Sequence, residues 1–175
     1  MHKFEINRRE FLRYLGYGAV SIAGYQLLSA CNAFSNPSQT PAFQGEPDIE
    51  IRLTAAPATQ QILPGRKTAV WRYQAEVLKG PSDSILTIPD SFLGPIFNLG
   101  KGTNLRVHFN NQLPEESIVH WHGLHVPDHA DGHPRFVIEK GETYEYNFTV
   151  MDRAGSYWYP PHPHGRTGPQ VYQGL

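Results

Sequence analysis

Residues 105–110 read LRVHFN, with an apolar side chain at every second position. Successive side chains of a β-strand point to opposite faces of a sheet, so this pattern predicts a strand with one buried and one solvated face. The same alternation occurs at residues 49–54, 71–77 and 144–150. Half-buried strands of this kind predict an all-β domain.

The segments between these strands are rich in turn-forming residues. The chain contains 16 Gly and 15 Pro. Combinations of Gly with Pro or Lys stand at residues 64–65, 80–81, 94–95, 100–102 and 140–141. Turns at this spacing are typical of an antiparallel sandwich or barrel. No segment shows a convincing helical period, and we find no internal repeat.

The composition limits the classes of function. A chain of 175 residues suffices for one domain of ordinary size. With 39% hydrophobic and 12% aromatic residues it can bury a core, which excludes wholesale disorder. Its 15 basic and 16 acidic side chains argue against a general nucleic-acid binder. The single cysteine excludes an internal disulfide.

The first thirty residues have the features of an export signal. Residues 7–13, NRREFLR, contain a twin arginine, and residues 14–30 are mostly apolar but too short and interrupted to span a bilayer permanently. This order predicts a bacterial Tat signal over residues 1–30. The alternative is an ordinary amphipathic N-terminal helix.

The segment that follows predicts a tether. LSAC at residues 28–31 resembles a bacterial lipobox, in which Cys31 would be lipidated; the alternative is a chance cysteine near an ordinary cleavage site. Residues 31–47 are rich in Ser, Pro, Gln, Asn and Ala and predict a flexible linker. We therefore expect a periplasmic or cell-envelope protein, anchored to a membrane if Cys31 is acylated.

Histidines are concentrated in one part of the chain. Of 9 in all, seven lie between His120 and His164. The sequence IVHWHG at residues 118–123 predicts a strand on which His120 and His122 project to the same face, about 6.5 to 7 Å apart. A second pair, His162 and His164, follows an aromatic run. Imidazole suits copper, zinc, iron and nickel, so the pairs indicate a metal site without selecting the metal. The alternative is a surface run of loop histidines.

With these motifs the sequence resembles the multicopper oxidases, which include laccases, bilirubin oxidases and bacterial copper efflux oxidases. The matching segments are Gly94-Pro95, Gly100-Lys101-Gly102, Asn111-Gln112-Leu113-Pro114, His120-Trp121-His122-Gly123-Leu124, Asp131-Gly132, Tyr157-Trp158-Tyr159 and Gln170-Val171-Tyr172-Gln173-Gly174-Leu175. The resemblance implies that residues 48–175 form a plastocyanin-like (cupredoxin) domain, a Greek-key β-sandwich. It would be the first of the two or three such domains in these enzymes.

The resemblance also implies copper as the cofactor. His120 would bind the type 2 copper and His122 one of the paired type 3 coppers, in a trinuclear centre that reduces dioxygen to water with electrons from a small reductant. Asp131 matches an acidic residue that orients water and relays protons. An Asp-Gly turn accounts for Asp131 equally well.

The second histidine pair departs from the family pattern. Pro160 stands where a type 3 copper ligand is expected, and a proline side chain cannot bind metal. His162 matches the second ligand of that pair. His164 matches a further histidine of some bacterial members, and it could substitute only if the loop shifts by two residues.

The family's electron-entry site is not among these residues. Family members hold a type 1 copper with a cysteine of the last domain, and this chain has no cysteine after Cys31. The trinuclear centre also needs histidines from that C-terminal domain. We therefore expect the 175 residues to supply at most half of the site and to lack oxidase activity alone. By comparison with the family, the domain is also expected to lack its final strand.

Three functions remain open from the sequence. The first is copper binding by the N-terminal part of an exported multicopper oxidase. The second is a stand-alone copper-binding lipoprotein that uses His120, His122, His162 and His164 for a mononuclear site. The third is a copper-free cupredoxin-like protein of the cell envelope.

Overall fold

A computed structural model describes residues 7–10, 43 and 45–175. The chain divides into two units, residues 1–38 and 39–175. The described part of the first unit is a helical turn at residues 8–10, in which the Asn7 side chain accepts the N–H of Glu10 at 2.9 Å and the Glu10 carboxylate accepts the N–H of Asn7. This reciprocal cap begins the turn that carries Arg8 and Arg9. The rest of the predicted signal, Cys31 and most of the predicted linker lie outside the described residues.

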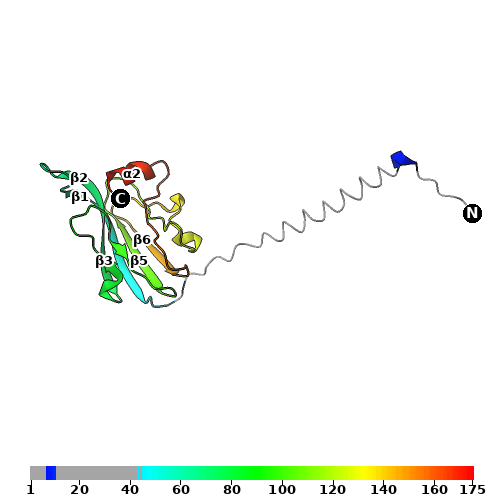
Figure 1. Cartoon of the computed structure of the whole chain (residues 1–175), viewed down its shortest axis with the longest axis horizontal. Coiled ribbons are helices and arrows are strands. Elements are labelled where there is room, and N and C mark those ends of the chain that lie inside the picture. The colour runs from blue at the N-terminus through cyan, green and yellow to red at the C-terminus, as the bar shows by residue number, and fades with distance from the viewer. Residues whose placement is uncertain (1–6, 11–42, 44) are drawn as a thin grey trace, which may run out of the picture. The chain divides into compact units, whose positions relative to one another are not determined.

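The second unit is built mainly from strands. Its main sheet contains β1 (Ile49–Gln60), β2 (Thr68–Lys79), β5 (Asn104–Asn111) and β6 (Thr143–Thr149), in the order β2-β1-β5-β6. A small second sheet pairs β3 (Ile85–Leu86) with β4 (Ile96–Phe97). Short 3₁₀ turns occupy Ser82–Ser84, Asp128–Ala130 and Pro134–Phe136. Figure 1 shows the strands of the main sheet side by side.

The main sheet is mixed, whereas the sequence predicts an antiparallel arrangement. β1 pairs with β2 in antiparallel register and β5 with β6 likewise, but β1 pairs with β5 in parallel, with Leu53 opposite Phe109. Residues 61–103 separate these two strands, a connection long enough for the crossover that a parallel pair requires. Alternation along each strand is the same in both arrangements, so the pattern could not distinguish them.

The predicted inward-facing residues form the core. Among the predicted inward-facing side chains, seven have no exposed surface: Ile51, Leu53, Leu105, Val107, Phe109, Tyr146 and Phe148. Each buried side chain of this size contributes about 1.5–3 kcal/mol relative to an exposed position. A slip of one residue would turn this set toward solvent, so the core fixes the register of the sheet.

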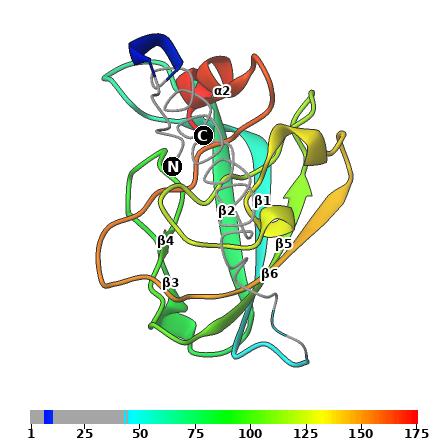
Figure 2. The same ribbon diagram turned by 90° about the vertical axis from the view of Figure 1, so that its right-hand side faces the viewer.

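A helix is present where none was predicted. The helix α2 (Thr167–Gln173) lies at the end of the sheet that carries the turn between β1 and β2 (Figures 1 and 2). Pro169 stands in its first turn, where a backbone N–H has no partner within the helix. The Gln170 amide is fully buried, accepts the Ser117 hydroxyl at 2.8 Å and donates to the Glu116 carbonyl at 2.8 Å. Seven residues are too few to display a helical period, so the sequence pattern missed it. No helix in the described parts of the chain is long and apolar enough to cross a membrane.

Candidate metal centre

The two histidine motifs meet because residues 118–122 run antiparallel to residues 158–162. Three backbone hydrogen bonds define the pairing: His120 N–H to Pro160 O at 3.0 Å, His122 N–H to Trp158 O at 2.9 Å and His162 N–H to Ile118 O at 2.9 Å. Residues that stand opposite one another in such a pair share a face. The register therefore places the side chains of His120, His122 and His162 on one face.

The predicted strand at residues 118–123 is an extended segment with isolated bridges, Val119 to Pro161 and His122 to Trp158. The ladder is interrupted because Pro160, opposite His120, has no N–H to donate to the His120 carbonyl. The predicted alternation of faces is present nonetheless. Trp121 is buried, and its ring centroid lies 5.9 Å from that of Tyr159 in the core.

Three imidazoles lie together on this face. The ring centroid of His120 is 5.4 Å from that of His122 and 5.0 Å from that of His162. We call these residues the histidine cluster. His164 has an exposed side chain, and within the described residues no ring contact joins it to the cluster. Across residues 7–10, 43 and 45–175, no group of three or more His, Cys, Asp or Glu side chains is arranged to hold a single ion.

Residues 131–132 fix the orientation of His120. Its Nδ1 lies 2.7 Å from the carbonyl oxygen of Asp131 and 3.3 Å from that residue's carboxylate. Because a carbonyl can only accept, Nδ1 carries the hydrogen, and the lone pair of Nε2 is available to a metal. Gly132 permits this approach: its φ is +75°, and a Cβ there would lie 1.8 Å from the Val119 carbonyl oxygen. The structure thus places Asp131 against a candidate ligand and also in a tight turn.

His162 has the properties of a neutral ligand without a protein partner. Its Nδ1 is buried and makes no hydrogen bond within the described residues. Burial, and then the neighbouring His120, hold the pKa of His162 below its ordinary value. Buried polar atoms normally find a partner, so a metal ion is a chemically suitable one here. Imidazole nitrogens suit copper, and the residues present therefore fit the implied cofactor.

Tyr146 supports the cluster from the core, a role that its sequence pattern does not show. Its hydroxyl donates to the carbonyl of Val119 at 2.9 Å and accepts the Val119 N–H at 2.9 Å. Burial raises the pKa of Tyr146 well above its ordinary value, so the hydroxyl keeps its hydrogen. Both backbone groups of the residue before His120 are thereby satisfied. In the sequence, the only indication of this role is that a tyrosine, whose hydroxyl needs a hydrogen-bond partner, occupies an inward-facing position of a predicted strand.

His125, which has no role from the sequence, is paired with Asp152. Its Nδ1 lies 2.5 Å from one carboxylate oxygen, and its backbone N–H donates to the other at 3.0 Å. The Asp152 side chain is 7% exposed, whereas that of His125 is 85% exposed. Burial alone would raise the pKa of Asp152, but the hydrogen bonds from His125 hold it below its ordinary value.

Comparison with known proteins points to one family. The family model described as multicopper oxidase matches residues 69–175. Over 102 residues the chain is 37% identical to the multicopper oxidase mco of Staphylococcus aureus, an alignment that covers 58% of this chain and 23% of that protein. It is 32% identical over 101 residues to copper resistance protein A of Escherichia coli, covering 56% and 16% of the two chains.

Solved structures give the same result. McoA multicopper oxidase from Aquifex aeolicus superposes with a TM-score of 0.60 at 39% identity, covering 78% of this chain and 26% of that one. The laccase from Pediococcus acidilactici Pa5930 superposes with a TM-score of 0.61 at 31% identity, covering 80% and 28%. These neighbours confirm the predicted all-β, cupredoxin-like fold. The chain spans between 16% and 28% of the length of these relatives.

Proposed function

The chain belongs to the multicopper oxidase family, and we propose that its cupredoxin-like domain binds copper through His120, His122 and His162. The observation that carries this proposal is the histidine cluster, with ring centroids 5.4 and 5.0 Å from His120. His120 has a free Nε2, and His162 has a buried nitrogen without a protein partner. Both are donor atoms prepared for a metal ion.

We further propose that this domain is the first cupredoxin domain of a larger oxidase and supplies half of a trinuclear copper site. His120 would hold the type 2 ion, and His122 and His162 the type 3 pair. Bound copper would supply the electrons that reduce dioxygen to water, and a small reductant would replace them. This role requires C-terminal cupredoxin domains, a requirement compatible with a chain that spans only part of its relatives' length.

The residues of this chain would contribute orientation and proton handling. Asp131 holds His120 through its carbonyl oxygen, and its carboxylate stands 3.3 Å from the same ring nitrogen. At 41% exposure this carboxylate can exchange protons with solvent. We propose that Asp131 orients His120 and relays protons to the site.

The position of Pro160 leaves the half-site one imidazole short of the family pattern. Pro160 stands opposite His120, and the hydrogen bond from His120 N–H to its carbonyl oxygen, at 3.0 Å, fixes that register. A two-residue shift, which would place His162 opposite His120 and His164 at the present position of His162, would break this bond and the two beside it. We therefore propose that His164 does not substitute as a ligand.

A metal titration of the full chain tests copper binding. We expect anaerobic titration with Cu(I) against a competing chelator to show binding that the double variant His120→Ala/His122→Ala weakens at least about tenfold, the effect of losing about 1.4 kcal/mol. His162→Ala should also weaken binding. His164→Ala and the exposed loop variant His129→Ala are matched controls and should bind as the unaltered chain does. Equal affinity in the double variant would overturn the proposal.

Export and anchoring remain proposals from the sequence. We propose that Arg8 and Arg9 direct export by the Tat route and that Cys31 carries a lipid. The variant Arg8→Lys/Arg9→Lys should then stay in the cytoplasm, and Cys31→Ser should move the exported protein from the membrane to the soluble fraction. Unchanged fractionation of either variant would contradict the corresponding proposal.

A further inference from the structure

A two-stranded arm projects from the main sheet and ends in an exposed turn. β1 pairs with β5 only as far as Ala55, but its pairing with β2 continues to Gln60, opposite Thr68. Among the strands that the structure describes, only β2 therefore continues beside β1 beyond Ala55, and Figure 1 shows their turn extending past the rest of the sheet. Residues 61–69 are all exposed. We call residues 61–67, which join the two strands, the hairpin tip.

Two adjacent aliphatic side chains of the hairpin tip face solvent. Ile62 is 45% exposed and Leu63 is 72% exposed. The side-chain amide of Gln61 donates to the carbonyl oxygen of Leu63 and, at 3.3 Å, to that of Gly65. These hydrogen bonds give the turn a defined conformation in which both aliphatic side chains point away from the core. Apolar surface presented in this way is favourable only where an apolar phase takes it up.

The charge of the hairpin tip is positive. Arg66 and Lys67 are exposed, and neither forms an ion pair with a described carboxylate. Residues 51–75 contain no Asp or Glu, so no acidic side chain in this part of the hairpin offsets the two charges. Cations next to exposed aliphatic side chains complement the surface of an anionic bilayer, in which phosphate groups lie above acyl chains.

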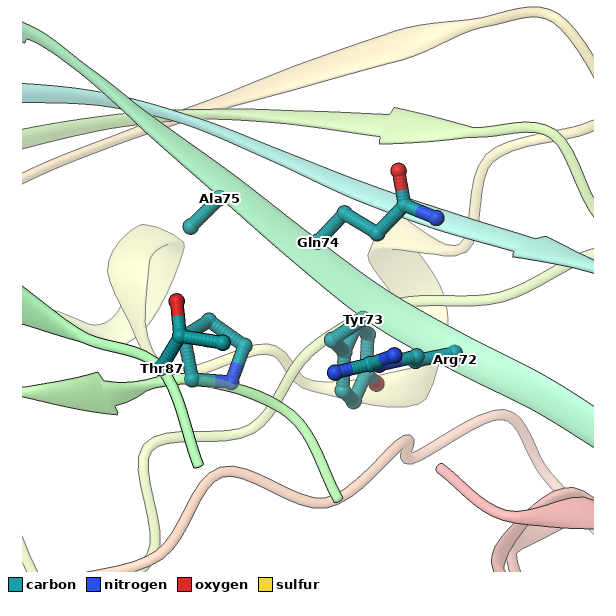
Figure 3. A pocket seen from close by; sticks show the side chains of 6 residues that line it. Arg72, Tyr73, Gln74, Ala75 and Thr87 are labelled. Carbon is teal, nitrogen blue, oxygen red and sulfur yellow. The ribbon is translucent and has the colours of Figure 1, made fainter. Parts of the chain in front are cut away.

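Arg72, a further cation of β2, does not belong to this surface. It stands at the base of the arm, opposite Ala56, and lines a pocket together with Tyr73 and Thr87 (Figure 3). Its Nε is buried. The exposed charge at the end of the arm is therefore that of residues 66 and 67, which directly follow the turn that presents the two aliphatic side chains.

The helix α2 adds exposed apolar side chains at the same end of the domain (Figures 1 and 2). Val171 is 44% exposed and Tyr172 is 92% exposed. The helix ends against β2, because a Cβ at Gly174 would lie 2.6 Å from the Trp71 carbonyl oxygen. A tyrosine has an apolar ring and a polar hydroxyl, a combination suited to the boundary between water and lipid. Two elements at this end thus carry exposed apolar side chains.

We propose that the hairpin tip docks on the surface of an anionic lipid bilayer. Ile62 and Leu63 enter the boundary between headgroups and acyl chains, and Arg66 and Lys67 pair with the lipid phosphates. Docking requires neither the histidine cluster nor acylation of Cys31. It orients the domain with the turn between β1 and β2 toward the membrane.

Vesicle co-sedimentation tests the proposal with the full chain, carrying Cys31→Ser to exclude acylation. We expect stronger partitioning onto mixed phosphatidylglycerol and phosphatidylcholine vesicles than onto phosphatidylcholine alone, and weaker partitioning at high salt. Arg66→Gln/Lys67→Gln should lower the partition coefficient on the anionic vesicles about tenfold or more. Ile62→Ser/Leu63→Ser should lower it by a similar factor, because less apolar surface leaves water. Every variant keeps the N-terminal segment, so differences between variants report on the hairpin tip.

Matched variants away from the hairpin tip are the controls. Leu86→Ser/Ile96→Ser removes a cross-strand pair of aliphatic side chains from the small sheet, 44% and 48% exposed. Lys101→Gln/Arg153→Gln removes two exposed cations, one just before β5 and one just after β6. Both should leave the partition coefficient unchanged. The hairpin-tip variants alter only exposed side chains, so urea denaturation should show them to be as stable as the unaltered chain.

Four results would overturn the proposal. The first is equal partitioning of either hairpin-tip variant and the unaltered chain, and the second is an equal loss in the control variants. The third is displacement from vesicles by inorganic phosphate beyond that by chloride at equal ionic strength, which would make the tip a site for free phosphate. The fourth is lipid-free dimerisation that Ile62→Ser/Leu63→Ser abolishes, measured by sedimentation equilibrium, which would mean that a second copy of the chain covers the tip.

Discussion

The hydroxyl of Tyr146 satisfies both backbone groups of Val119, so removing one oxygen atom tests the support behind His120. Tyr146→Phe keeps the ring in the core but leaves a buried N–H and a buried carbonyl without partners. Each such group costs about 1–3 kcal/mol. We expect the free energy of unfolding, measured by urea denaturation, to fall by about 2 kcal/mol or more. Tyr172→Phe, at a position 92% exposed, should change it by less than about 0.5 kcal/mol. Equal stability of the two variants would show that the Tyr146 hydroxyl does not support this segment.

Asp152 makes the stability of the domain depend on pH. Its pKa is held below the ordinary value of 3.8, so the contribution of its charge is complete above that value and is lost as the pH falls through the lowered pKa. We expect Asp152→Asn to reduce the free energy of unfolding by about 1 kcal/mol at neutral pH. As the pH falls below about 4, the difference in stability between the unaltered chain and Asp152→Asn should close, because protonated Asp152 is neutral like the asparagine that replaces it. Glu46→Gln, which alters the solvent-exposed pair with Lys79, is the control and should show no comparable gap. A gap that persists in acid would contradict this assignment.

The contacts of Tyr146 and Asp152 could not be predicted from residue patterns, whereas the histidines could. His120, His122 and His162 could be identified from spacing and from resemblance, because their chemistry is visible in short motifs. The partners Tyr146 and Asp152 each lie 27 residues from the group that they bind. Nothing local to either residue indicates that contact, which depends on how β6 and the following loop pack.

At the scale of elements, residues 118–122 show what a periodic pattern can predict. It predicts which face of the segment a side chain occupies better than it predicts how the segment pairs with its neighbour. Alternation correctly placed Trp121 in the core and the histidines on the other face. A regular ladder also needs an N–H on every hydrogen-bonded residue of the partner segment, and Pro160, opposite His120, has none. The irregular ladder follows from the partner, so it could not be predicted from residues 118–123 alone.

The turn at Gly132 offers a sharper test of how this segment is held. Gly132 and Gly141 both have positive φ, +75° and +89°, but a Cβ at Gly132 would lie 1.8 Å from the Val119 carbonyl oxygen, whereas one at Gly141 would meet nothing within 4 Å. Gly141→Ala should cost about 1–2 kcal/mol for the left-handed conformation alone. Gly132→Ala should cost at least about 3 kcal/mol, because the backbone must also move. Thermal or urea unfolding measures both. Similar losses would show that the approach to Val119 is not tightly packed.

At the scale of the whole molecule, the sequence predicted the all-β class and the inward-facing residues, but not the mixed sheet or α2. The core side chains of β1 and β5 would be buried in either strand direction, so hydrophobicity carries no information about the parallel pairing. α2 is held by the buried Gln170 and its contacts with residues 115–117, which lie more than fifty residues away. Both features are set by long-range contacts.

Long-range contacts also couple metal binding to folding. The cluster is assembled from residues 118–122 and 158–162, so the three imidazoles come together only in the folded domain. A metal that binds there should stabilise the fold by about 2.7 kcal/mol when its free concentration is about 100 times its Kd. We therefore expect buffered Cu(II) to raise the unfolding temperature, measured by circular dichroism, in the unaltered chain and in His164→Ala. The variant His120→Ala/His122→Ala should show little or no increase. A copper-induced decrease would mean that the unfolded chain binds copper more tightly than the folded cluster, and would contradict a site built by the fold.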